Sequence, residues 1–302
     1  MIFVGKKNST SFFLLISLIL GLALYTALFS SCVYEDLSKC SRMFMLQPRY
    51  LLHTGEGDRF GEAVHHIDVY AFDSLGIYRK MFRDKGAHLK NGYRMPIDLP
   101  EGKWTFLCLG GKVGDYEIGI FKTGIPQQFS PAVSPGITTL SDFRVKAYFE
   151  QKENLEYSLG ELFFGRLDSV EITADNGGTG VVDLMKNTNK IEVRVKGIAD
   201  GSSARITSDN GRFNSENVTP ADAGTIIYVP YYSASQADDT RVFQFDVLRL
   251  YTDGHLFLKL LNPDGTDVIP GFTKDLINAI MSSPAYHTQE LSLIHISEPT
   301  RP

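Results

Sequence analysis

IDVYAFDSLGIYRKMF, residues Ile67–Phe82, is the clearest structural signal in this chain. Residues that favour β-structure lie on both sides of a short break, Asp73–Gly76, which is typical of two antiparallel strands joined by a tight turn. Asp73 can accept hydrogen bonds from the backbone that follows it, and Gly76 tolerates a positive φ angle. The stretch therefore predicts a β-hairpin.

Further short strands follow, and glycine, asparagine, aspartate and proline mark the turns between them. Residues 103–111, KWTFLCLGG, are apolar at successive positions, which is typical of a strand buried on both faces, and Trp104 is expected to fill the core there. We expect residues 95–99 to pair with this strand. Short helices are expected only within residues 140–156 and 273–281. The pattern predicts an all-β fold.

The pattern of polar and strand-forming residues changes near Gly165. The motif ELFFG, Glu161–Gly165, follows a polar stretch, and from Val170 the strands resume at spacings that suit a second β-sandwich. We therefore expect an N-terminal β-sandwich over residues 43–165 and a C-terminal β-sandwich over residues 166–290, in series and with minor short helices.

Residues 1–31 have the layout of a bacterial export signal. Two lysines precede an uncharged apolar run, Phe12–Leu28, and small residues follow it before Cys32. A signal that ends on a cysteine is typical of a lipoprotein, although Phe29 stands where leucine is usual. The run is also near the lower length limit for crossing a bilayer, so an uncleaved anchor and an ordinary signal peptide are the alternatives. We expect lipidation at Cys32 and a linker over residues 32–42.

The chain has 3 cysteines. If Cys32 carries lipid, Cys40 and Cys108 are left as an even pair in an oxidising compartment, which allows a disulfide. Two unpaired cysteines are the alternative, because Cys108 lies in an apolar run where a thiol packs as a small hydrophobe. The sequence leaves both states open.

Charge and motifs exclude several function classes. The formal net charge of −5 offers no basic field for nucleic acid. No GxSxG, HExxH or CxxC motif occurs, and no Lys-Ser/Thr pair follows Gly110 and Gly111 as a phosphate loop requires. His65 and His66 are adjacent, so in a strand they would point to opposite faces and could not share a metal. We expect no catalytic residue, no metal and no cofactor.

Residues Leu291–Arg301, LSLIHISEPTR, look like a translated sequencing adapter read in one frame. Residues 291–302 are therefore predicted to be an adapter-derived artefact. The natural chain is then expected to be cut at or near Glu290, with a truncated C-terminal β-sandwich.

Four features now stand together: Cys32 followed by VYEDLSKC, the hairpin IDVYAFDSLG, ELFFG in the middle of the chain, and LMKNTNKIEVRVKG at residues 184–197. Together they resemble the fimbrillin-associated anchor proteins of Bacteroidetes over most of Cys32–Glu290. The resemblance implies two transthyretin-like β-sandwich domains in series on a lipid anchor in the outer membrane. None of the motifs that carry it is catalytic. It also implies a non-catalytic protein at the fimbrium base that holds the fimbria to the cell surface, limits its length and binds shaft subunits by strand exchange.

Two other functions fit an exported, tethered β-sandwich protein. A surface glycan-binding lipoprotein would use Trp104 and tyrosines as a stacking platform, which requires exposed aromatic rings. A tip adhesin of the same fimbrial system would lie at the filament end instead of the membrane.

Overall fold

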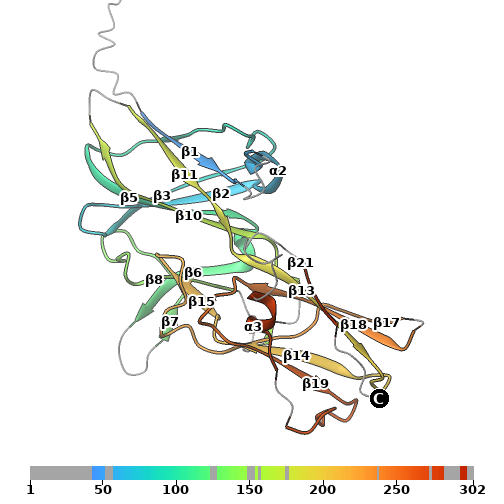
Figure 1. Ribbon diagram of the computed structural model, residues 1–302. Helices are drawn as coiled ribbons and strands as arrows, with labels where there is room; N and C mark the ends of the chain where they lie inside the picture. Colours follow the sequence, from blue (N-terminus) through green and yellow to red (C-terminus); the bar gives the residue numbers. More distant parts are fainter. Residues whose placement is uncertain are drawn as a thin grey trace, which may run out of the picture. The chain divides into compact units, whose positions relative to one another are not determined.

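The computed structural model describes residues 43–51, 57–122, 128–147, 154–155, 158–173, 177–236, 238–271, 274–281 and 293–297. The chain splits into two compact units, Met1–Ser41 and Arg42–Pro302, and every described residue lies in the second. The described elements are almost all β-strands, with a few short helical segments (Figure 1). No described helix is long and apolar enough to cross a membrane. The predicted all-β class is confirmed.

A five-stranded sheet of order β12-β10-β5-β2-β3 organises the first part of this unit. Its strands are β2 (His66–Phe72), β3 (Tyr78–Lys85), β5 (Gly102–Gly111), β10 (Leu162–Ile172) and β12 (Met185–Lys186). Strands β2 and β3 form the predicted hairpin. In its turn, Asp73 Oδ1 accepts hydrogen bonds from the backbone N–H groups of Leu75 and Ile77 at 2.9 and 3.0 Å, and Gly76 has a φ of 71°.

Both faces of β5 are buried, as the sequence predicts. Phe106 and Cys108 lie in one hydrophobic core, whereas Leu107 and Leu109 lie in another, because successive side chains of a strand point to opposite faces. Trp104 is 6% exposed in the first of these cores, and its Nε1 donates a hydrogen bond to the carbonyl of Pro100 at 3.1 Å. Its predicted role as a core residue is confirmed.

The first core is closed by a three-stranded sheet of order β11-β1-β4. Its strands are β1 (Phe44–Arg49), β4 (Met95–Ile97) and β11 (Thr179–Asp183). The expected pairing of residues 95–99 with β5 is wrong, because β4 pairs with β1. Both edges of β5 are already taken by β2 and β10, so the short turn after β4 carries the chain from one sheet to the other.

The domain boundary expected near Gly165 falls inside strand β10. On either side of this glycine, Phe164 pairs with Leu109 and Arg166 pairs with Leu107. A Cβ at Gly165 would lie 2.7 Å from Leu184 Cδ2, so glycine stands here because two segments pack closely, not because a domain ends. Strand pairing therefore places the residues on both sides of Gly165 in the same sheet.

A four-stranded sheet of order β15-β8-β6-β7 follows. Its strands are β6 (Tyr116–Lys122), β7 (Gln128–Ser130), β8 (Phe143–Ala147) and β15 (Arg212–Asn214). The helix expected within residues 140–156 is wrong where the structure describes that stretch, because FRVKA forms β8. Its side chains alternate between buried and half-buried, which is the period of a strand.

Two further sheets, of orders β17-β18-β13-β21 and β20-β19-β14-β16-β9, complete the second group. Their strands are β9 (Asn154–Leu155), β13 (Thr188–Lys196), β14 (Ser203–Ser208), β16 (Ile226–Tyr228), β17 (Tyr232–Ser235), β18 (Thr240–Leu248), β19 (Leu256–Leu261), β20 (Lys274–Asp275) and β21 (Leu293–Ser297). Strand β21 lies within the residues predicted to derive from an adapter, and that origin stays a prediction.

In the part of the chain that the structure describes, three short helical segments accompany the strands: α2 (Phe60–Ala63), a 3₁₀ turn (Val113–Asp115) and α3 (Leu276–Met281). The helix predicted within residues 273–281 is confirmed as α3. Asp275 Oδ1 accepts a hydrogen bond from the backbone N–H of Ile277 at 3.0 Å, whereas Thr273, the expected cap, lies outside the described residues.

Candidate functional site

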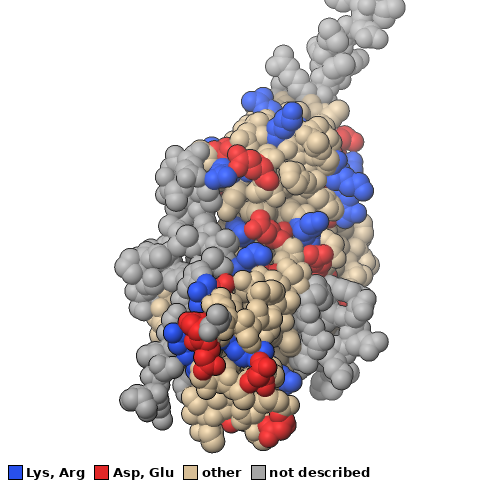
Figure 2. All heavy atoms as spheres, turned by 90° about the vertical axis from the view of Figure 1, so that its right-hand side faces the viewer, with Lys and Arg blue, Asp and Glu red and all other residues tan. Residues whose placement is uncertain are grey.

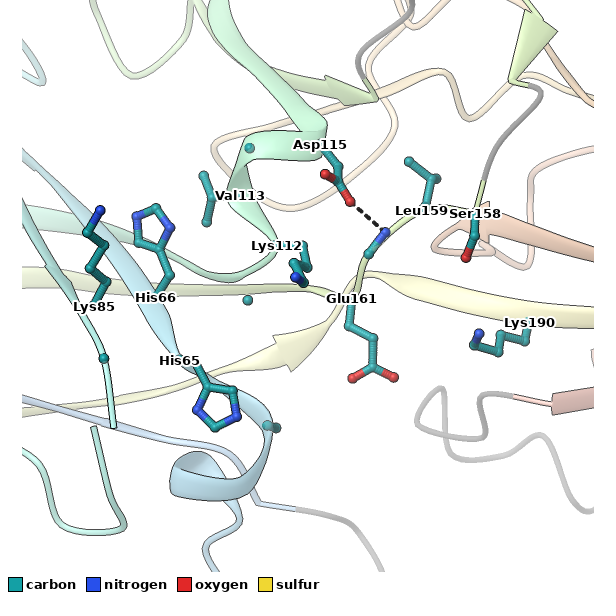
Figure 3. Close-up of a pocket in the computed structure, with 15 residues that line it drawn as sticks. His65, His66, Lys85, Lys112, Val113, Asp115, Ser158, Leu159, Glu161 and Lys190 are labelled. Carbon is teal, nitrogen blue, oxygen red and sulfur yellow. Dashed lines mark hydrogen bonds between the residues drawn. The ribbon is translucent and has the colours of Figure 1, made fainter. Parts of the chain in front are cut away.

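A pocket of about 950 Å³ lies at one end of the five-stranded sheet (Figure 3). The antiparallel pairing explains its position, because β2 begins there while β3 ends, and β5 ends there while β10 begins. Residues that are far apart in the sequence, including His65, Lys85, Lys112 and Glu161, thus line the same space. We call it the sheet-end pocket.

Hydrogen bonds fix one wall of the sheet-end pocket. The backbone N–H of Lys112 donates to the carbonyl of Glu161 at 2.8 Å, and the backbone N–H of Gly160 donates to Asp115 Oδ2 at 2.8 Å (Figure 3). The hydroxyl of Tyr116 donates to the carbonyl of Gly160 at 2.6 Å. A Cβ at Gly160 would overlap the side chain of Lys112. Only glycine fits where these two segments cross.

Ion pairs and hydrogen bonds already engage part of the charge at the sheet-end pocket. Glu161 Oε1 lies 2.5 Å from Nζ of the buried Lys186. Lys190 Nζ lies 3.5 Å from Oδ1 of the buried Asp246, whose Oδ2 accepts a hydrogen bond from the hydroxyl of Ser158 at 2.5 Å. These groups are held by protein partners and contribute little charge to a ligand.

The two adjacent histidines differ in their partners. His66 Nε2 lies 2.9 Å from Oδ1 of the buried Asp68, whereas His65 is exposed and precedes β2. The sequence predicts these rings on opposite faces of a strand, but both line the sheet-end pocket, because His65 lies in a bend and not in the strand. Among the described residues, no group of three or more His, Cys, Asp or Glu side chains is placed to hold a metal ion.

Two lysines of the sheet-end pocket, Lys85 and Lys112, have no ion pair with any described residue, and neither has the imidazole of His65. By contrast, the other basic side chains of β3 are all paired, Arg79 with Asp73, Lys80 with Asp98 and Arg83 with Asp68. The apolar part of the lining comes from Ala63, Val113 and Leu159. The pocket thus combines apolar walls with cations that are free to bind an anion.

The sheet-end pocket has no signature in the sequence, because its residues meet only through sheet pairing. The nearest signal is LGGKVGDY, residues 109–116, which is rejected as a phosphate loop. In the structure Gly110 and Gly111 end β5, and a single 3₁₀ turn that contains Gly114 follows. This segment supplies Lys112, Val113 and Asp115 to the lining.

The residues predicted as sites lie elsewhere. Cys32 and Cys40 are outside the described residues, so lipidation and the disulfide stay predictions. Cys108 is a free, fully buried thiol, and burial raises its pKa because the thiolate would be desolvated. Trp104 is buried as well, which removes it from any exposed stacking platform.

Charged side chains of both signs are interspersed on the face of the molecule that Figure 2 shows. Lysine and arginine do not gather there into a single basic patch, which is what binding to a nucleic-acid backbone requires.

Comparison with known proteins identifies relatives over most of the chain. A sequence model of the fimbrillin-A associated anchor proteins Mfa1 and Mfa2 matches residues 37–294. The minor fimbrium anchoring subunit Mfa2 of Porphyromonas gingivalis is 24% identical over 299 residues, which cover 94% of this chain and 86% of the relative.

Solved structures share the fold. The fimbrial anchor protein Mfa2 from P. gingivalis has a TM-score of 0.67 and 20% identity, covering 85% of this chain and 89% of that one. A Bacteroides thetaiotaomicron protein for which polysaccharide binding has been proposed has a TM-score of 0.71 and 21% identity, covering 84% and 90%. At these identities the likeness shows the fold alone.

Proposed function

This chain belongs to the family of fimbrillin-A associated anchor proteins, and we propose on that ground that it holds a fimbria to the outer membrane as a lipid-anchored subunit. The observation that carries this proposal is the family match over residues 37–294, which begins just after Cys32. A cysteine with three acyl chains would be attached almost permanently, since each buried methylene contributes about 0.8 kcal/mol.

Replacement of Cys32 tests the anchor. In a host that makes the fimbria, Cys32→Ala is expected to move the protein and its fimbriae from the membrane fraction to the medium, as measured by immunoblotting and electron microscopy. Cys40→Ala is the matched control, because it removes a thiol eight residues further along without touching the lipid site. Unchanged membrane retention of Cys32→Ala would overturn lipid anchoring. Released protein with fimbriae still attached to cells would overturn the anchoring role.

The shaft connection is proposed to use strand exchange, in which an extended segment of a shaft subunit adds to an open sheet edge. Strand β17, Tyr232–Ser235, supports this idea because it is an edge strand with no charged residue, and Tyr232 is 48% exposed. Charged residues on edge strands normally discourage such pairing. Ser233→Lys should therefore detach the shaft while the protein stays folded and in the membrane; Ser233→Thr is the neutral control.

Control of fimbrial length is also part of the proposed function. A bound base subunit ends growth of the shaft at the membrane, so a strain that lacks this protein is expected to shed fimbriae that are longer than those of the parent. Electron microscopy of shed and attached fimbriae measures both lengths. Equal length distributions in the two strains would contradict this role.

A glycan-binding function has weaker support. Polysaccharide binding has been proposed for one solved relative, but the similarity to that protein is 21% and concerns the fold. Trp104, the aromatic residue on which a stacking platform would rest, is buried between two sheets. The anchoring role is the function that the family and the structure together support best.

A further inference from the structure

We propose that the sheet-end pocket binds an acidic, aliphatic segment of a partner protein. The chemistry of the pocket is independent of the lipid anchor. Only the identification of the partner as a fimbrial subunit rests on the proposed function.

Charge is the first argument. Lys85 and Lys112 line one space from two different segments, and neither has an ion pair with a described residue; the unpaired imidazole of His65 lines the same space. A single unpaired surface lysine is ordinary, but two at one pocket, beside an imidazole that can donate a hydrogen bond, favour carboxylates. Glu161 is paired with Lys186, and one oxygen of Asp115 is held by the backbone N–H of Gly160, so Asp115 is the one carboxylate among the described lining residues without an ion pair.

Size and lining decide between kinds of anion. A pocket of about 950 Å³ is far larger than one carboxylate or phosphate needs, so it can take several consecutive side chains. Among the described residues of the lining there is no Phe, Tyr or Trp on which a sugar ring could stack. Apolar walls with cations at the rim suit a segment in which acidic and aliphatic residues alternate.

Gly114 is a position at which a larger side chain can be introduced to fill the pocket. It belongs to the lining, and a Cβ at this position would meet no atom within 4 Å. A large side chain there can enter the pocket without displacing the backbone. Gly111 and Gly160 cannot be used in this way, because a Cβ at either position would overlap neighbouring atoms.

Fluorescence polarisation of the detergent-solubilised full chain tests the proposal with two labelled hexapeptides, one alternating glutamate and leucine and one alternating glutamine and leucine. The acidic peptide should bind more tightly. Lys85→Gln and Lys112→Gln should each weaken its binding about 1.5-fold to fivefold, the range for one exposed charge pair. Gly114→Phe should abolish binding. Lys80→Gln removes the same charge from β3 at a residue outside the lining, and should change nothing.

Several outcomes would overturn the proposal. Equal binding of the two peptides, or equal losses for Lys80→Gln and Lys85→Gln, would show a general charge effect without a pocket. Full binding by Gly114→Phe with an unchanged unfolding midpoint would place the peptide elsewhere. Binding of an oligogalacturonate, lost in Gly114→Phe, without binding of the acidic peptide would assign the pocket to an acidic glycan.

A cell experiment separates this proposal from the anchoring role. Lys85→Gln/Lys112→Gln is expected to stay in the membrane fraction while retaining fewer fimbriae, whereas Cys32→Ala leaves the membrane altogether. Normal retention of fimbriae by the double variant, with peptide binding lost, would show that the partner is another protein and would leave the anchor intact.

Discussion

Asp68 on β2 and Arg83 on β3 lie directly opposite each other, and Nε and Nη2 of Arg83 each lie 2.6 Å from a different carboxylate oxygen of Asp68. The Asp68 side chain is fully buried, while that of Arg83 is 51% exposed. The negative charge of the buried carboxylate is therefore compensated mainly by the guanidinium. The guanidinium, in contrast, is also solvated by water. The hairpin predicted from the sequence is thus joined by a charge pair whose carboxylate is buried and whose guanidinium is half-exposed.

This difference in exposure predicts that Arg83→Gln and Asp68→Asn lower the free energy of unfolding by different amounts. Arg83→Gln leaves a buried carboxylate without its main partner and should lower the free energy of unfolding by about 3 kcal/mol, as for other broken buried pairs. Asp68→Asn should cost less, because water can solvate the remaining guanidinium. Urea unfolding measures both variants. The double variant should be more stable than Arg83→Gln alone, and purely additive losses would contradict the pairing.

The buried thiol predicts a pattern of chemical reactivity. Cys108 is fully buried and its pKa is raised by desolvation, so a thiol reagent should not react with it in the folded protein. In denaturant without reductant it should react at once, because Cys108 is free in the structure. Cys40→Ser should leave the reaction of Cys108 unchanged. Reaction that requires prior reduction would establish the Cys40–Cys108 disulfide instead.

The exposed pair of His255 and Asp275 predicts a pH dependence. His255 Nδ1 lies 3.1 Å from Asp275 Oδ2, and this hydrogen bond raises the pKa of His255 above 6.5. Because the folded-state pKa is the higher one, the stabilisation is fully present below pH 6.5 and is lost as the pH rises through the raised pKa.

An NMR titration of the His255 ring checks this shift. Asp275→Asn should bring the pKa of His255 back toward 6.5, because it removes the leading cause of the shift. Asp209→Asn should lower it less, since Asp209 acts on the ring only through its charge. An equal effect of the two variants would mean that the hydrogen bond is not the cause.

Two glycines predict opposite responses to the same substitution. A Cβ at Gly165 would lie 2.7 Å from Leu184 Cδ2 and 2.8 Å from Val182 Cγ2, so Gly165→Ala should destabilise the protein by about 2 kcal/mol through overpacking. Gly114→Ala meets no atom within 4 Å and should change stability by less than about 0.5 kcal/mol. Urea unfolding compares them, and equal losses would refute the packing role of Gly165.

Local chemistry allowed the hairpin, its turn and the short C-terminal helix to be predicted. Asp73 and Gly76 make the turn by contacts within a few residues, and Trp104 lies in a run apolar enough to require burial on both faces. Helix α3 follows from its own composition. The prediction of residues 140–156 as a helix failed because β8 is held by pairing with β6 and β15, which lie elsewhere in the chain.

By itself, the sequence determined the all-β class, the strands with strong local signals and the family resemblance, because each depends on neighbouring residues. Only the tertiary structure decided that β4 pairs with β1, that β10 continues through Gly165, and that Lys85 and Lys112 share a pocket. The physical reason is that a strand carries two hydrogen-bonding edges, and nothing in its own side chains states which distant strand will occupy each edge.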